Sequence, residues 1–313
     1  MPDGQLIITG ATGFIGRRLA AHLAAAGRPV IAFTRRADDH LPTGIPSRPL
    51  DSLLDGSRTE DLAGTSLIHL LGRAHVMKET ARDSLAAFRA VNVDLTLAIA
   101  RRFAEAGGKR FVFVSSIKAN GEQTEPGHPF RHDSTPRPVD PYGLSKWEAE
   151  QALHHLGAET GLEIVVVRPT LVLGPGAAGN VAAMLRWLEK GVPLPFGGID
   201  NRRSFVGIDN LVSLLLTAAD HPRAAGETFL AADPDALSTP ALLRRIGTLL
   251  GRSPRLVPVP PGFIRSLAAL LGQQARADRL LGSLEVDSSH QARTLGWTPP
   301  KTIDQSLSDL IRS

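Results

Sequence analysis

Short apolar runs alternate with longer helical patterns over the first half of the chain. Several runs rich in Val, Ile, Leu and Phe predict strands, at 5–9, 29–34, 66–72, 111–116 and 162–168. Between them, apolar residues recur at helical spacing, most clearly over 81–105 and 142–155. This alternation predicts an α/β fold with a doubly wound parallel sheet and right-handed crossovers.

A glycine-rich loop follows the first of these strands and precedes an alanine-rich helix. Its glycines allow a tight turn and a close approach of backbone amides to a pyrophosphate, and the helix directs its positive end at that anion. A strand before the loop and a helix after it are the context that such a motif requires. We therefore predict a dinucleotide site formed by Gly10, Thr12, Gly13, Phe14, Ile15 and Gly16.

The strand over 29–34 is followed by Arg35 and Arg36. An NAD-binding unit usually carries an acidic residue here for the ribose 2′-hydroxyl, whereas guanidinium groups suit a 2′-phosphate. The arginines favour NADP(H), and NAD(H) is the alternative if they are solvated loop charges. Asp51 is expected at the adenine edge, and Leu71 and Gly72 are expected to face the cofactor.

From residue 170 the regular alternation of strand and helix patterns ends. We expect a helix from Asn180 to Glu189, a short strand over 227–230 and a helix capped by Ser238. An amphipathic helix over 264–271 is expected to face the core rather than a membrane surface. The predicted units are a dinucleotide-binding domain, 1–169 rejoined by 205–232, and a smaller C-terminal lobe that binds substrate, 170–204 with 233–313.

Composition and charge argue against several classes of protein, among them nucleic-acid-binding, disulfide-bonded and membrane-spanning proteins. The formal charge of +4 is spread along the 313 residues rather than clustered, which argues against a nucleic-acid partner. The chain has no cysteine, which excludes disulfides and thiolate metal sites, and its histidines lack metal-ligand spacing. No secretory signal or run of ~18 apolar residues is found, so we expect a cytoplasmic protein without membrane insertion.

The candidate chemistry centres on Tyr142 and Lys146, four residues apart at the start of a predicted helix. Ser116 ends the strand over 111–116, at the sheet edge where α/β proteins place their chemistry. An ammonium ~4 Å from a phenol at an effective dielectric of ~20 favours the phenolate by about 4 kcal/mol. We therefore expect the pKa of Tyr142 to fall from about 10 towards 7. Asn92 could hydrogen-bond the backbone and hold a water beside the lysine, whereas His69 is expected to be a hydrogen-bonded core residue.

With these residues assembled, the chain resembles the extended short-chain dehydrogenase/reductases of the sugar-nucleotide epimerase/dehydratase family. The resemblance covers nearly the whole chain and rests on several motifs: Gly10, Gly13 and Gly16, Asn92, Ser116, Tyr142 with Lys146, Arg168-Pro169, and Arg203-Ser204-Phe205-Val206. It implies that Tyr142 is the acid/base, that Lys146 binds the nicotinamide ribose, and that Ser116 hydrogen-bonds the reacting oxygen. It also implies a homodimer formed through a four-helix bundle.

The same resemblance implies a nucleoside-diphosphate sugar, most simply UDP-linked, under the C-terminal lobe. Carried over by position, Asn180 and Arg203 bind the diphosphate, Phe196 lies near the nucleobase, and Arg279 is a second phosphate arginine. Pro169 lies at the cofactor. Two residues depart from the family pattern: Asn120 stands where a tyrosine is common, and Lys118 is a cation that could touch the sugar. The stretches 115–118 and 200–203 resemble a branch found in bacterial surface-polysaccharide pathways.

The expected reaction takes place at C4 of the sugar. Arg35 and Arg36 favour NADPH-dependent reduction of a UDP-4-keto-6-deoxy-N-acetylhexosamine, because a 4-epimerase regenerates its cofactor and gains nothing from selecting NADPH. The alternative is a UDP-hexose or UDP-N-acetylhexosamine 4-epimerase that retains NAD. A non-catalytic NADP-binding sensor is a further alternative, but such proteins typically lose the tyrosine–lysine pair.

Overall fold

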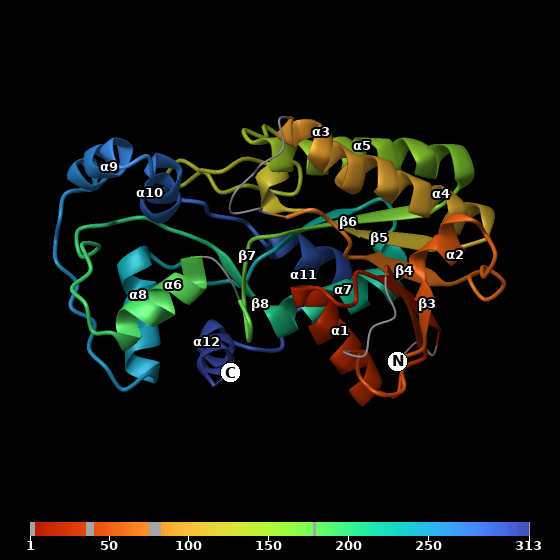
Figure 1. The fold of residues 1–313 in the computed structure, drawn as a ribbon, viewed down its shortest axis with the longest axis horizontal. Helices are drawn as coiled ribbons and strands as arrows, with labels where there is room; N and C mark the ends of the chain where they lie inside the picture. The colour runs from red at the N-terminus through yellow and green to blue at the C-terminus, as the bar shows by residue number, and fades with distance from the viewer. Residues whose placement is uncertain (1–3, 36–40, 75–82, 178–179, 313) are drawn as a thin grey trace.

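A seven-stranded parallel sheet forms the centre of the protein (Figure 1). The computed structural model describes residues 4–35, 41–74, 83–177 and 180–312. The strand order is β3-β2-β1-β4-β5-β6-β9, with every pair parallel, so the predicted doubly wound sheet is confirmed. The strands are β1 (Leu6–Thr9), β2 (Val30–Thr34), β3 (Ser47–Pro49), β4 (Ser66–His69), β5 (Arg110–Val114), β6 (Glu163–Pro169) and β9 (Thr228–Ala231).

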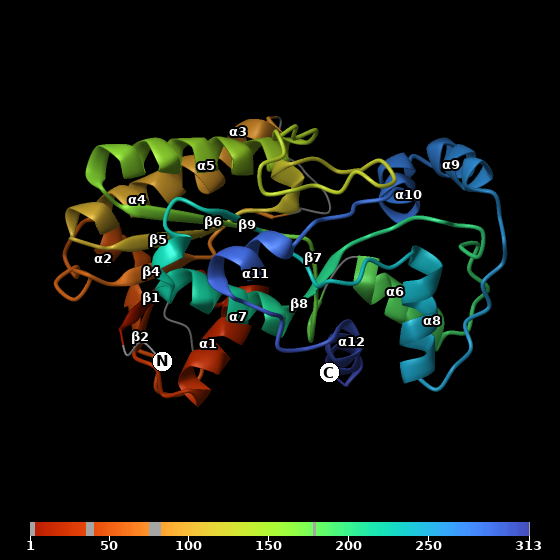
Figure 2. The ribbon, with the colours of Figure 1, turned by 180° about the vertical axis from the view of Figure 1, so that it is seen from behind.

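Helices cover both faces of this sheet, as the two opposite views show (Figures 1 and 2). One face carries α1 (Phe14–Ala25), α7 (Ile208–Asp220) and α11 (Ser289–Leu295); the other carries α2 (Leu50–Leu54), α4 (Thr96–Glu105) and α5 (Pro141–Thr160). Alternate side chains of a strand enter opposite cores: Leu6 and Ile8 pack on the α1 side, and Ile7 packs on the α5 side. Burial on both faces explains why the strands are continuous apolar runs.

A smaller lobe with its own apolar core follows β6. Its two-stranded parallel sheet is β7 (Leu171–Leu173) with β8 (Phe205–Gly207), and its core is packed by α6 (Asn180–Glu189), α8 (Thr239–Leu249), α10 (Gln274–Leu281) and α12 (Ile303–Ile311). The predicted cap is present, because the Ser238 hydroxyl accepts a hydrogen bond from the Ala241 amide at 3.2 Å. As expected, the chain returns to the main sheet at β9.

The single helix predicted over 81–105 is interrupted. Its described part contains α3 (Ser84–Arg89), a π-helical segment η1 (Ala90–Leu95) and α4. The sequence pattern predicts a helix here but not its π segment, because such segments are rare single-turn features inside α-helices. Two short 3₁₀ turns are also present, η2 (Ile117–Ala119) and η3 (Pro222–Ala224).

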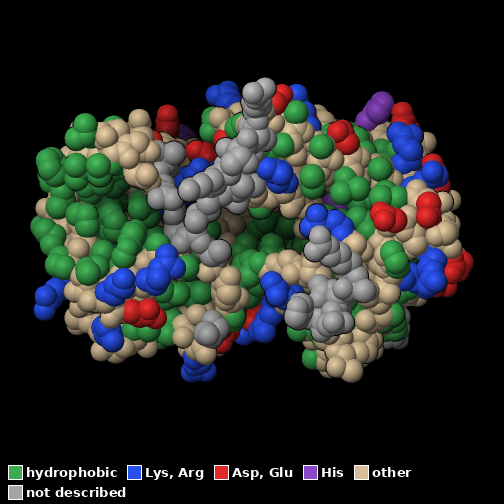
Figure 3. Space-filling view, viewed as in Figure 1, with side chains coloured by type: hydrophobic (Ala, Val, Ile, Leu, Met, Phe, Trp, Pro, Cys, Tyr) green, Lys and Arg blue, Asp and Glu red, His purple; other side chains and the backbone are tan. Residues whose placement is uncertain are grey.

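The expectation that the helix over 264–271 faces the core holds for one side of it only. In α9 (Pro261–Leu270) no residue is buried, and Phe263, Leu267 and Leu270 are 64, 48 and 84% exposed. Only Ile264 and Ala268 pack against the lobe's core. The helix lies at the end of the molecule, where hydrophobic side chains gather on the surface (Figures 1 and 3). No helix among the described residues is long and apolar enough to cross a bilayer.

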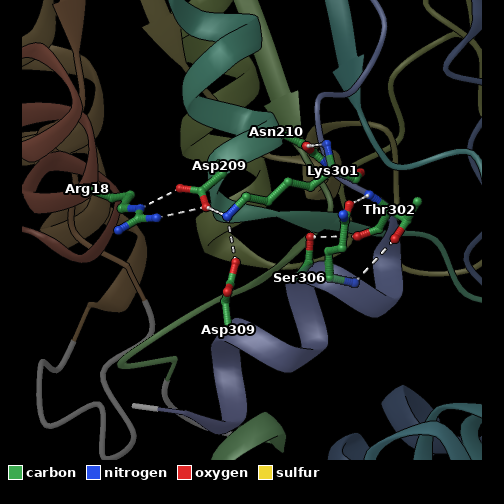
Figure 4. A network of polar contacts seen from close by, with 8 residues as sticks. Arg18, Asp209, Asn210, Lys301, Thr302, Ser306 and Asp309 are labelled. Atoms are coloured by element: carbon green, nitrogen blue, oxygen red, sulfur yellow. Dashed lines mark hydrogen bonds and ion pairs between the residues drawn. The ribbon is translucent and has the colours of Figure 1, made fainter. Parts of the chain in front are cut away.

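An ionic network ties the C-terminal segment to the central sheet domain (Figure 4). Asp209, in the first turn of α7, accepts hydrogen bonds from Arg18 of α1, one of them at 2.8 Å. The Lys301 ammonium lies 2.6 Å from both Asp209 and Asp309, and Asn210 bonds both the amide and the carbonyl of Lys301 at 2.9 Å. The Arg18 hydrogen bond, followed by that from Lys301, lowers the pKa of Asp209 to about 2.

Candidate active site

The glycine-rich loop lies between β1 and α1 and leaves no room for side chains. Gly10 has φ +76°, and a Cβ on it would lie 2.7 Å from the Leu70 carbonyl carbon. A Cβ on Gly16 would lie 2.1 Å from the Gly10 carbonyl oxygen. Gly13 precedes the first turn of α1 without a side-chain cap, so the amides of Phe14 and the residues after it are left open to an anion. This cradle fits a dinucleotide pyrophosphate.

The other predicted cofactor residues lie at or beyond the carboxyl ends of neighbouring strands. Arg35 follows β2 and is exposed, and Asp51 is exposed in the first turn of α2, after β3. Gly72, two residues beyond Leu70, lies close to the lysine: a Cβ on it would be 3.1 Å from Lys146 Nζ. Further predicted residues occupy the same edge of the sheet: Thr12, Ile15, Leu71 and Pro169. Arg36 lies outside the described residues.

Tyr142, Lys146 and Ser116 meet at the carboxyl end of β5. The Ser116 side chain lies close enough to the Tyr142 phenol to lower its pKa. Lys146 Nζ donates to the Val114 carbonyl at 3.0 Å and lies 4.6 Å from the centre of the Phe113 ring. Helix α5 is held at this point by Asp140, which caps it by accepting from the Gly143 amide at 2.6 Å. The four-residue spacing places Tyr142 and Lys146 on successive turns of α5, beside the carboxyl end of β5, and their catalytic roles stay predictions.

The expected fall in the pKa of Tyr142 is wrong for this structure. Burial of the phenol raises the pKa to about 12, although the Ser116 hydrogen bond acts in the opposite direction. Lys146 offers no compensation, because its ammonium is itself buried and is directed to the Val114 carbonyl. Burial lowers the pKa of Lys146 to about 8, partly offset by the Glu150 carboxylate. In both groups the low-polarity surroundings disfavour the charged form.

Asn92 is fully buried in η1 and connects the loop after β4 to α5. Its Oδ1 accepts from the Arg73 amide at 2.8 Å, which confirms the expected backbone contact. Its Nδ2 donates to the Arg73 carbonyl at 3.2 Å and to the Ser145 hydroxyl at 2.9 Å. The π turn and these bonds fix the side chain beside Gly72, whose added Cβ would lie 3.3 Å from Asn92 Oδ1.

Two polar groups near the site, Ser145 and Glu150, were not predicted from the sequence. Ser145 bonds Asn92, as described above, and Glu150 forms a buried ion pair with Arg168 of β6. Arg168 also donates to Asn120 Oδ1 at 2.9 Å. A signal was present, because Tyr142, Lys146 and Glu150 recur every four residues and therefore share one face of α5.

His69 behaves as a core residue, as predicted. Its ring nitrogens are hydrogen-bonded to Thr9 at 2.8 Å and Thr96 at 3.1 Å, and burial lowers its pKa to about 3. The described residues contain no cluster of His, Cys, Asp or Glu that could hold a metal ion.

On the substrate side, Arg203 and Arg279 lie close enough to influence each other. Burial, and then the charge of Arg279, lower the pKa of Arg203 to about 10, while Glu122 opposes the shift. Arg203 also donates to the Gly282 carbonyl at 2.8 Å. Two neighbouring guanidinium groups are an arrangement that an anion would stabilise.

The remaining predicted substrate residues are more widely spread. Lys118 forms ion pairs with Glu122, at 2.5 Å, and with Asp140, so its charge holds the loop to the start of α5. Phe196 is only 6% exposed and packs with Trp187 in the core of the lobe. Asn180 begins α6, and its side chain lies outside the described residues. The substrate contacts of these residues stay predictions.

The comparison with known proteins agrees with this geometry. The model of the NAD-dependent epimerase/dehydratase family matches residues 6–232. This chain belongs to that family. It is 38% identical to the UDP-glucose 4-epimerase of Vibrio cholerae, over 97% of this chain and 93% of that protein. The family is made of short-chain dehydrogenase/reductase enzymes that include epimerases and reductases of sugar nucleotides.

Two other proteins bear on the site. The N-acetyl-α-D-glucosaminyl-diphospho-ditrans,octacis-undecaprenol 4-epimerase of Escherichia coli O157:H7 is 26% identical, over 98% of this chain and 96% of its own length. The crystal structure of UDP-glucose 4-epimerase with UDP-glucose from Thermotoga maritima superposes with a TM-score of 0.77, at 23% identity over 98% of this chain and 97% of that one. The structural likeness shows the shared fold.

Proposed function

We propose that this enzyme is a 4-epimerase of a UDP-linked hexose or N-acetylhexosamine that retains NAD through its catalytic cycle. The observation that carries the proposal is the complete set of Ser116, Tyr142 and Lys146 at the carboxyl end of β5, beside the glycine cradle. The similarity to a UDP-glucose 4-epimerase over nearly the whole chain supports the same assignment.

In this proposal NAD held at the glycine cradle of Gly10, Gly13 and Gly16 would supply reversible hydride chemistry at C4 of the sugar. Tyr142 takes the proton from the O4 hydroxyl and later gives it back, and Ser116 donates a hydrogen bond to the same oxygen. Lys146 presents a positive charge next to the cofactor loop at Gly72. Arg203 and Arg279 would hold the diphosphate, because an anion relieves the repulsion between their charges.

The alternative within the same site is net reduction of a UDP-4-keto-6-deoxy-N-acetylhexosamine. Arg35 supports it, because this exposed guanidinium follows β2, where a 2′-phosphate of NADPH would lie. It needs no change in the roles of Ser116 and Tyr142. The family description names NAD, and for that reason we favour the retained cofactor.

The sugar carrier has a second candidate, a polyisoprenyl diphosphate. The relative from Escherichia coli O157:H7 carries such a carrier in its name. The exposed apolar helix α9 packs against α10, the helix that supplies Arg279, so a lipid chain attached to the diphosphate would have an apolar surface nearby. We also expect a cytoplasmic homodimer, paired through the outer surfaces of α4 and α5.

The decisive experiment incubates the purified protein with UDP-glucose and with UDP-N-acetylglucosamine and follows the C4 epimer by NMR. We expect epimer to form without added cofactor and NAD to be released when the protein is denatured. Stoichiometric oxidation of NADPH by a UDP-4-keto-6-deoxy-N-acetylhexosamine, without epimer formation, would establish the reductase instead.

A Tyr142→Phe variant tests the chemical step. Its turnover should fall by about 10³-fold or more because no other group replaces the phenol as proton carrier, while the NAD content stays unchanged. The matched variant Phe88→Tyr leaves Tyr142 in place and adds a hydroxyl to a ring 5.8 Å away, so it should retain substantial turnover. Full activity of Tyr142→Phe would refute the assigned role.

A further inference from the structure

We propose that α9, the connector before it (251–260) and the segment after α6 that pairs with this connector form a docking surface for an anionic lipid bilayer. The surface consists of Val192, Val257, Phe263, Leu267, Leu270 and Leu271, and is called the α9 face below. These side chains are 40, 44, 64, 48, 84 and 64% exposed. The inference is independent of which sugar the enzyme uses.

The α9 face has the geometry of a helix lying in a membrane interface. Its helical members are spaced at i, i+4, i+7 and i+8 from Phe263, which places them on one side of the helix. Ile264 and Ala268 lie round the helix from them and pack onto the lobe. The outward apolar side is therefore not explained by core packing, and contiguous exposed patches of this kind mark interaction sites.

The connector extends the same surface. Val257 N donates to the Leu194 carbonyl at 2.8 Å, and the Leu194 amide donates to the Arg255 carbonyl at 2.8 Å, so two chain segments lie side by side. This pairing places exposed Val192 and Val257 on neighbouring segments. Figure 3 shows hydrophobic side chains gathered at this end of the molecule, with basic side chains below them.

The charges near the α9 face fit an anionic surface. Lys190, Arg252 and Arg255 are exposed on or beside its segments, next to the acidic Glu189. Arg265 of α9 is also exposed, and it forms an ion pair with Asp278 of α10 at 3.6 Å. Apolar residues that enter the headgroup region, flanked by arginine and lysine that contact anionic lipid, are the combination found in interfacial helices.

A second copy of the chain fits this surface less well. A twofold contact would place each α9 face against the same face of its partner, so that the basic residues of both copies would meet. Like charges brought together in this way oppose association. A bilayer instead supplies negative charge to every one of these residues.

Vesicle flotation of the full-length protein tests the proposal. We expect it to float with vesicles of phosphatidylcholine and phosphatidylglycerol, and less with phosphatidylcholine alone or at high salt. The double variant Phe263→Asp with Leu270→Asp should bind at least about tenfold more weakly. Its thermal unfolding should match the parent's, because both side chains already face solvent.

Val139→Asp is the matched control, since Val139 is 71% exposed but belongs to the segment before α5. It should bind vesicles like the parent protein. An equal loss in this control, an unchanged double variant, or no flotation of the parent would each overturn the proposal. So would light scattering that shows a dimer converted to monomers by the double variant without any vesicle binding.

Discussion

At the residue scale, the positions of Tyr142 and Lys146 follow from their spacing in the sequence, whereas the pKa of Tyr142 follows from its surroundings in the fold. The four-residue interval from Tyr142 to Lys146 places both side chains on one face of any helix, so their meeting with Ser116 could be predicted. The pKa of Tyr142 could not, because it depends on how completely the fold buries the phenol and on where the lysine ammonium points. In the structure burial prevails, and the value rises to about 12.

The elevated pKa of Tyr142 predicts a distinctive alkaline titration, because the chain contains one tyrosine. No phenolate absorbance should appear in the cofactor-free protein below about pH 10, the ordinary value for tyrosine. The unfolded state loses this proton first, so the stabilising contribution is complete below pH 10 and disappears as the pH rises towards 12. Near-ultraviolet absorbance measured as a function of pH detects the phenolate, and circular dichroism at the same pH values shows whether the protein is still folded.

The Tyr142→Phe variant is the control for that titration and should show no phenolate signal. A signal that titrates near pH 7 in the folded, cofactor-free protein would contradict the burial argument and would restore the original expectation that Lys146 stabilises the phenolate.

At the element scale, the π-helical segment η1 is the feature that sequence periodicity missed. It carries the buried Asn92, whose amide is bonded to the Arg73 backbone and the Ser145 hydroxyl. The segment therefore joins the loop after β4 to α5, the two places from which Gly72 and Lys146 come. A local irregularity in one helix in this way sets the geometry of the candidate site.

Replacing Asn92 by alanine should weaken both stability and activity. The Arg73 amide and carbonyl would lose their bonds to the side chain, which costs about 1–3 kcal/mol for buried groups. We expect a lower urea midpoint and a kcat that falls more than KM rises. Asp94→Ala, an exposed position in the same segment, should change stability by less than about 0.5 kcal/mol. Equal behaviour of the two variants would show that η1 has no positioning role.

At the scale of the whole molecule, ion pairs as well as apolar packing attach the C-terminal segment to the rest of the protein. The network of Arg18, Asp209, Lys301 and Asp309 links α1, α7 and α12, which are far apart in the sequence. Because α12 packs in the lobe's core, this network helps to hold the lobe against the sheet that carries the candidate site.

Asp209→Asn should therefore destabilise the protein at neutral pH by about 1 kcal/mol, a modest value because Arg18 is partly exposed and solvent screens the pair. The pKa of Asp209 is lowered from 3.8 to about 2, so its contribution is present above pH 4 and is lost as the pH falls towards 2. Between pH 4 and pH 2 the free energy of unfolding should therefore fall less steeply in the variant than in the parent protein.

Asp304→Asn provides the comparison for that measurement. Asp304 lies in α12, like Asp309 of the network, and pairs with Arg245. It is 63% exposed, so replacing it should have little effect on stability. If both substitutions shifted thermal unfolding equally, the network would have no special role in joining the two parts of the molecule.

The sequence by itself determined the features that depend on local spacing. Alternating apolar runs specify the parallel sheet, glycines at 10, 13 and 16 specify the turn before α1, and the interval from Tyr142 to Lys146 specifies a shared helix face. The caps at Asp140 and Ser238 are likewise local, since each bonds an amide three residues on. Such relations span a few residues and need no knowledge of distant neighbours.

Only the tertiary structure decided what depends on surroundings. Whether α9 is buried depends on whether another element covers it, and the pattern of an interfacial helix is the same as that of a core-facing one. The partners of Lys118, the buried Glu150–Arg168 pair and the pKa of Tyr142 depend on groups brought together by folding. Burial and electrostatics act through space, and the spatial neighbours of these side chains are set by the packing of the whole molecule.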